Sequence, residues 1–162
     1  MAADREIVAR QIGREPRAFR RVAVRCPFGM PAVTEQSPYA PGGEPFPTTY
    51  YVTCRHLVQA ISRLEADGGV ERWTQAAARD ESLRASREWA DAESARIRKE
   101  LAATDEGLGL DTGVGGAGRT GSLKCLHAHA AFALAHPEYE LGRRILAELP
   151  QLWPDRCCTG DP

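Results

Sequence analysis

Two stretches rich in glycine and proline constrain this chain more than any other feature. Residues 30–48 hold five prolines and two glycines, and residues 104–121 hold seven glycines. Proline removes a backbone donor and glycine weakens helices and strands, so both stretches are predicted to be long irregular loops. Long loops in compact domains are commonly functional. Regular structure is therefore expected before, between and after these two stretches.

Hydrophobic periodicity assigns the remaining segments. Helices are expected where apolar residues recur every three or four positions, and strands where β-branched and aromatic residues cluster. The expected helices cover residues 4–12, 56–67, 123–135 and 141–149, with one or two more in 70–103, and the expected strands cover 22–25 and 49–53. This pattern predicts an α+β fold that is mostly helical, with a small β element that carries the first two cysteines.

Length and composition indicate one globular domain and exclude several functional classes. Residues 1–155 are expected to fold together, with 156–162 as a flexible tail. The formal net charge is -1, which gives no overall basic surface for nucleic acid. No apolar signal segment opens the chain, and no stretch approaches the ~20 apolar residues of a membrane span. We therefore expect a cytoplasmic protein without membrane association, in which cysteines stay reduced.

Three cysteines and two histidines form the main candidate site. Cys26 and Cys54 each follow an expected strand, and Cys125 lies in the first turn of an expected helix. On that helix His129 shares a face with Cys125, whereas His127 points elsewhere. Three thiolates and one imidazole suit a tetrahedral zinc site or an iron–sulfur cluster. The first hypothesis is a metal-binding or cluster-binding protein with these three cysteines as ligands and His129 or His127 as the fourth.

A thiolate-dependent enzyme is the first alternative. Cys125 or Cys26 would be the nucleophile, because a helix N-terminus or a neighbouring cation lowers the pKa of a thiol. A small anionic substrate would be held at Arg119, Ser122 and Lys124, where the glycine-rich stretch meets a helix.

A helical interaction module without catalysis is the second alternative. Residues 70–103 are rich in alanine, arginine and glutamate, so they are expected to face solvent and to bind a partner through exposed Trp73 or Trp89. Free cysteines also pack as small apolar side chains, which leaves inert thiols open as well. Cys157 and Cys158 are expected to lie exposed in the tail.

Four motifs together resemble one known family. They read Arg25-Cys-Pro-Phe-Gly-Met-Pro-Ala-Val33, Pro45-Phe-Pro-Thr-Thr-Tyr-Tyr-Val-Thr-Cys54, Leu64-Glu-Ala-Asp-Gly68 and Lys124-Cys-Leu-His-Ala-His129. As a set they resemble the bacterial, actinobacterial-type family catalogued as domain of unknown function 501. In that family proline usually follows the second cysteine, where this chain has Arg55. The resemblance implies a cytosolic protein and supplies no activity.

Overall fold

The computed structural model describes residues 2–118 and 121–158 of the chain. Within them, helices surround a small antiparallel sheet, so the predicted α+β class is confirmed. No helix among them is both long and apolar enough to cross a membrane. The elements are α1 (Ala2–Ile12), β1 (Phe19–Arg25), β2 (Pro31–Gln36), β3 (Tyr50–Val52), α2 (Arg55–Ala66), α3 (Gly69–Arg79), α4 (Glu81–Ala102), a short 3-10 helix η1 (Val114–Gly116), α5 (Leu126–Ala135) and α6 (Glu140–Ala147).

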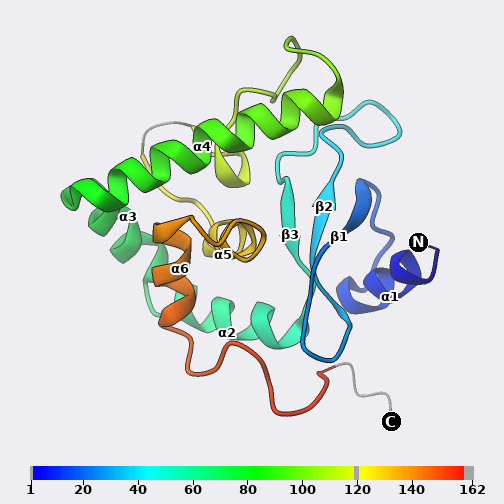
Figure 1. Cartoon of the computed structure of the whole chain (residues 1–162), viewed down its shortest axis with the longest axis horizontal. Coiled ribbons are helices and arrows are strands. Elements are labelled where there is room, and N and C mark those ends of the chain that lie inside the picture. Colours follow the sequence, from blue (N-terminus) through cyan, green and yellow to red (C-terminus); the bar gives the residue numbers. More distant parts are fainter. Residues whose placement is uncertain (1, 119–120, 159–162) are drawn as a thin grey trace.

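The sheet separates two sides of the molecule. Its strand order is β1-β2-β3, and Figure 1 shows α1 on one side of it and α5 on the other. Between β2 and β3, Val33 pairs with Val52, and Thr34 pairs with Tyr51. Because successive side chains point to opposite faces, the valine pair joins the hydrophobic core. Thr34 and Tyr51 instead face the α1 side.

The central strand overturns the prediction of one irregular loop over residues 30–48. β2 occupies Pro31–Gln36, and every residue in it is buried. A strand covered on both faces does not show the alternation of apolar and polar residues that identifies a half-exposed strand. Proline has no N–H to donate to a neighbouring strand, and it is tolerated at the first position of β2, where the sheet does not need that donor.

Residues 70–103 form two helices, α3 and α4, which meet at Asp80. The Asp80 side chain accepts a hydrogen bond from the backbone N–H of Leu83 at 3.1 Å and so caps α4. The prediction that this stretch faces solvent is wrong for α4, since one of its faces is buried. Trp73 is also buried, with 8% of its surface exposed, whereas Trp89 is 39% exposed. A partner surface built on Trp73 is therefore excluded.

The helix expected over residues 123–135 begins at Leu126 instead. Lys124 has a φ of 63°, in the left-handed region, and Cys125 is extended at the N-cap position. Ser122 does not cap the helix, because its hydroxyl accepts a hydrogen bond from the Lys124 N–H at 3.0 Å. Cys125 therefore lies at the junction between an extended segment and a buried helix.

Candidate functional site

Three potential metal donors converge where α2 meets the start of α5. A carboxylate oxygen of Glu65, the sulfur of Cys125 and a ring nitrogen of His127 all lie within 4.8 Å of one another. Nδ1 of His127 is 3.8 Å from Sγ of Cys125 and 3.1 Å from Oε1 of Glu65. Among the described residues this is the one group of three such side chains close enough to share an ion.

Glu65 is held in place by the N-terminus of α5. It lies in the last turn of α2, and its Oε1 accepts a hydrogen bond from the backbone N–H of Leu126 at 2.7 Å. Free N–H groups and the positive end of the helix dipole both favour a carboxylate at this position. Cys125 is the N-cap residue of α5, but its sulfur makes no capping hydrogen bond and so remains available as a metal donor.

His127 is oriented by contacts on both ring nitrogens. Its Nε2 lies 3.2 Å from the carbonyl oxygen of Val58 and 3.2 Å from the Ser62 hydroxyl. With Nε2–H donating to that carbonyl, Nδ1 is directed at Cys125 and Glu65. Burial lowers the pKa of His127, but the hydrogen bond to Cys125 and the charge of Glu65 outweigh it and raise the pKa to about 9.

Two of the three donors, Cys125 and His127, line a hollow of about 370 Å³ between β3, α2 and α5. Cys125 lines it from the N-cap of α5 and His127 from the first turn of that helix. Val58 and Ser62 line it from α2, and Tyr51 from β3. The side chains of His127 and Glu65 are 24% and 27% exposed, so they are shielded but not sealed. A small molecule in this hollow would contact Cys125 and His127 directly.

His129, which helical spacing favoured as the partner of Cys125, lies in the core. It is fully buried, with Nδ1 2.7 Å from the Tyr139 hydroxyl and Nε2 3.3 Å from the Leu123 carbonyl oxygen. Burial lowers the pKa of His129 to about 4, so the ring is neutral at physiological pH. Both nitrogens are satisfied within the protein. The spacing argument fails because Cys125 precedes the helix rather than lying within it.

The comparison with known families bears on the same residues. Residues 22–147 match the family described as "Protein of unknown function (DUF501)". The chain belongs to the DUF501 family. Glu65, Cys125 and His127 all fall within the matched stretch of this DUF501 protein. No curated protein and no solved structure matches the chain.

The other two predicted cysteine ligands of the DUF501 chain lie elsewhere. Cys26 is buried in the turn between β1 and β2, where its N–H donates to the Met30 carbonyl at 2.9 Å. Cys54 is buried at the start of α2, and burial raises its pKa to about 11. Its sulfur lies 3.6 Å from that of Cys158, which was expected to be exposed. The structure therefore does not bring Cys26, Cys54 and Cys125 into one group.

The predicted anion site is only partly described. Arg119 lies outside the described residues. Lys124 Nζ lies 3.4 Å from the carbonyl oxygen of Gly116, and the Ser122 hydroxyl is bonded to the Lys124 N–H. These contacts hold the segment before α5 in place and leave its role toward an anion a prediction.

Sequence reasoning missed Glu65. It lies in the Leu64-to-Gly68 motif, at the end of the helix expected over residues 56–67, and the helical pattern assigns no chemical role to its carboxylate. Its separation of 62 residues from His127 gives no local signal that the two side chains meet. The available signal was the presence of a carboxylate in a motif that accompanies the cysteine and histidine motifs.

Proposed function

We propose that this protein binds one zinc ion through Glu65, Cys125 and His127, with the fourth position facing the hollow beside β3. The observation that carries this proposal is the convergence of three different zinc donors on one point. Zinc bonds of about 2.3 Å to sulfur and about 2.0–2.2 Å to nitrogen and oxygen separate tetrahedral donors by roughly 3.4–3.6 Å. The distances from His127 Nδ1 to the other two donors, 3.8 and 3.1 Å, lie close to these values.

The surroundings of His127 also support zinc. Metal-binding histidines commonly donate their second ring N–H to a carbonyl or carboxylate, and Val58 accepts from Nε2 in this way. The pKa of about 9 reflects a proton held between Cys125 and Glu65. A divalent cation placed among the same groups takes the place of that proton and binds Cys125 and Glu65 as ligands.

The donor set favours zinc over an iron–sulfur cluster. Clusters are held mainly by thiolates, and the group contains one sulfur, one nitrogen and one carboxylate. All three donor types are ordinary zinc ligands. Three protein ligands with one open position are typical of catalytic zinc, which polarises a bound substrate or activates a bound water. A cytoplasmic location, where Cys125 stays reduced, is part of this proposal.

A thiolate–imidazolium pair is the second candidate, and the contact between Cys125 and His127 favours it. A histidine with a pKa of about 9 is protonated at pH 7 and stabilises a neighbouring thiolate. The hollow would then admit an electrophilic substrate to the sulfur. The two candidates differ in whether Glu65 and His127 are needed to hold a metal or to activate the thiol.

Metal analysis of untagged protein, purified anaerobically and then incubated with zinc and desalted, tests the first candidate. We expect about one zinc per chain, lost in Cys125→Ser and His127→Ala and kept in Cys54→Ser, the matched control. Less than about a tenth of an equivalent contradicts zinc binding. In that case, iodoacetamide labelling of Cys125 that is fast at pH 7 and slowed in His127→Ala supports the thiolate pair.

A further inference from the structure

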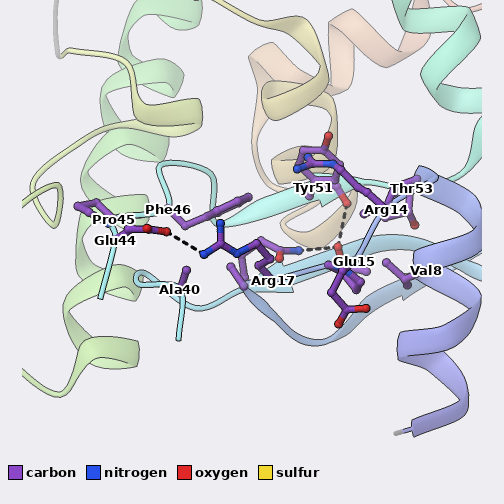
Figure 2. A pocket seen from close by; sticks show the side chains of 15 residues that line it. Val8, Arg14, Glu15, Arg17, Ala40, Glu44, Pro45, Phe46, Tyr51 and Thr53 are labelled. Carbon is purple, nitrogen blue, oxygen red and sulfur yellow. Dashed lines mark hydrogen bonds and ion pairs between the residues drawn. The ribbon is translucent and has the colours of Figure 1, made fainter. Parts of the chain in front are cut away.

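A second hollow lies on the opposite side of the sheet, beneath α1. It has a volume of about 140 Å³ and is enclosed by α1, the sheet and the turn that follows β2. Figure 2 shows Val8, Arg14 and Tyr51 on one side of it and Pro45 and Phe46 on the other, with Arg17 between them. None of the donors of the proposed zinc site lines this hollow.

The floor of this hollow is polar, although it is buried. Thr34, Gln36 and Thr53 line it and are 0%, 5% and 1% exposed. A sheet face covered by a helix ordinarily presents apolar side chains, as Val33 and Val52 do on the other side. Burying hydroxyl and amide groups is unfavourable unless they are hydrogen-bonded. The Thr53 hydroxyl has such a partner in the Pro31 carbonyl oxygen at 3.3 Å, and the Thr34 hydroxyl is also bonded, which leaves the carboxamide of Gln36.

Gln36 has unused hydrogen-bonding capacity. One N–H of its side chain donates to the Thr34 hydroxyl at 2.6 Å, and that hydroxyl lies 3.4 Å from the Tyr51 carbonyl oxygen. The side-chain oxygen of Gln36 and its second N–H have no partner among the described residues. A carboxamide presents both a donor and an acceptor to whatever occupies the hollow. An occupant with a polar group at this point satisfies both.

The charged side chains at the mouth are paired, apart from one. Arg17 bonds to Glu44 at 3.0 Å, and Glu15 pairs with Arg5. Arg14 lines the hollow and has no ion-pair partner among the described residues. The mouth therefore carries one uncompensated positive charge, which favours an anionic group near Arg14.

We propose that this hollow is a binding site for a small organic anion, a carboxylate or a phosphate monoester. Its charged group pairs with Arg14, its apolar body lies against Phe46 and Ile12, and its uncharged polar part reaches Gln36. Tyr51, in the edge strand β3, lines both this hollow and the one beside Cys125. The proposal does not depend on zinc.

Titration of the full chain by ¹H–¹⁵N NMR tests this site, with benzoate and phenyl phosphate as probes and benzamide as the uncharged match. We expect saturable shifts of the amides of residues 34, 36, 51 and 53, with a Kd of about 1 mM for the better anion. Arg14→Gln should weaken that anion about tenfold. Gln36→Met, which keeps the length and removes the carboxamide, should weaken it severalfold.

Arg10→Gln, at an exposed position of α1 four residues before Arg14, is the matched control and should leave binding unchanged. The better of the two anions distinguishes a carboxylate site from a phosphate site. Benzamide binding as tightly as both anions, equal losses in Arg10→Gln and Arg14→Gln, or shifts spread over the surface would each overturn the proposal. Cys125→Ser should bind the probes normally, so failure of the zinc site and failure of this site are distinguishable.

Discussion

Oε1 of Glu65 lies 3.1 Å from Nδ1 of His127 and at the same time accepts the Leu126 N–H at 2.7 Å. One carboxylate thus caps α5 and faces the imidazole. The capping contact fixes the carboxylate, and α5 fixes Cys125 and His127 beside it. The same small junction therefore serves the stability of the fold and the proposed zinc site, and substitutions can separate these two roles.

Glu65→Gln should separate them most cleanly. The amide oxygen still accepts the Leu126 N–H, so above pH 9, where His127 is neutral, the free energy of unfolding of the zinc-free protein should change by less than about 1 kcal/mol. The loss of negative charge should weaken zinc at least about tenfold, measured by competition with a chromophoric chelator. Glu65→Ala removes both contacts and should lower stability as well. Unchanged zinc affinity in Glu65→Gln would exclude this carboxylate as a ligand.

The pKa of His127 makes the stability of the zinc-free protein depend on pH. Because the pKa rises from 6.5 to about 9 on folding, the contribution of His127 is fully present below pH 6.5 and is lost as pH rises through 9. This contribution is on the order of 3 kcal/mol. Urea unfolding of wild type and His127→Gln should therefore differ at pH 6 and converge above pH 9. A difference that does not shrink with pH would contradict the raised pKa.

Zinc affinity should depend on pH in the opposite direction to the stability of the zinc-free protein. The ion binds the deprotonated ring, so apparent zinc affinity should rise as pH increases toward 9, with about one proton released by His127 for each ion bound. Calorimetry in buffers of different ionisation enthalpy measures that proton. Zinc binding without proton release at pH 7 would show that His127 is not a ligand.

His129→Ala should behave differently from His127→Ala. It removes the partner of the buried Tyr139 hydroxyl and leaves a cavity, so we expect a loss of about 3 kcal/mol in the free energy of unfolding. Zinc content per folded molecule should stay at that of wild type, measured at low temperature with circular dichroism to confirm the folded fraction. Loss of zinc with an intact fold would return His129 to the ligand set.

Cys54 and Cys158 should form a disulfide under mild oxidation. Their sulfurs are 3.6 Å apart, so a small movement reaches the bond length of about 2.05 Å. Diamide accepts the two electrons and two protons that the thiols lose when the bond forms. Peptide mapping should recover a Cys54–Cys158 link that is absent in Cys54→Ser and retained in Cys157→Ser. Exclusive linkage through Cys157 would contradict the observed pairing.

The sequence predicted the fold class and the helices well because these depend on local periodicity. It missed β2, since a strand buried on both faces shows no alternation and its flanks are rich in proline and glycine. It also placed the start of α5 at residue 123, although Lys124 adopts a left-handed conformation and the helix begins only at Leu126. That error of about one turn is why helical spacing favoured His129 over His127 as the partner of Cys125.

The candidate site was only partly predictable for a related reason. Cys125 and His127 are close in the chain and lie in one motif, so both were among the candidates. Glu65 joins them through the packing of α2 against α5, which no local pattern reports. Cys54 and Cys158 meet through a similar long-range contact, 104 residues apart. The predicted group of Cys26, Cys54 and Cys125 rested on chemical type alone, and the structure does not bring these three residues together.

Cobalt substitution tests the central claim most directly. Co²⁺ at a site with one thiolate gives a sulfur-to-metal charge-transfer band in the near ultraviolet, together with visible bands whose intensity reports tetrahedral geometry. We predict that wild type and Cys54→Ser show both features at one equivalent of cobalt, and that Cys125→Ser loses the charge-transfer band. A charge-transfer band that persists in Cys125→Ser, or that disappears in Cys54→Ser, would contradict a metal centre formed by Glu65, Cys125 and His127.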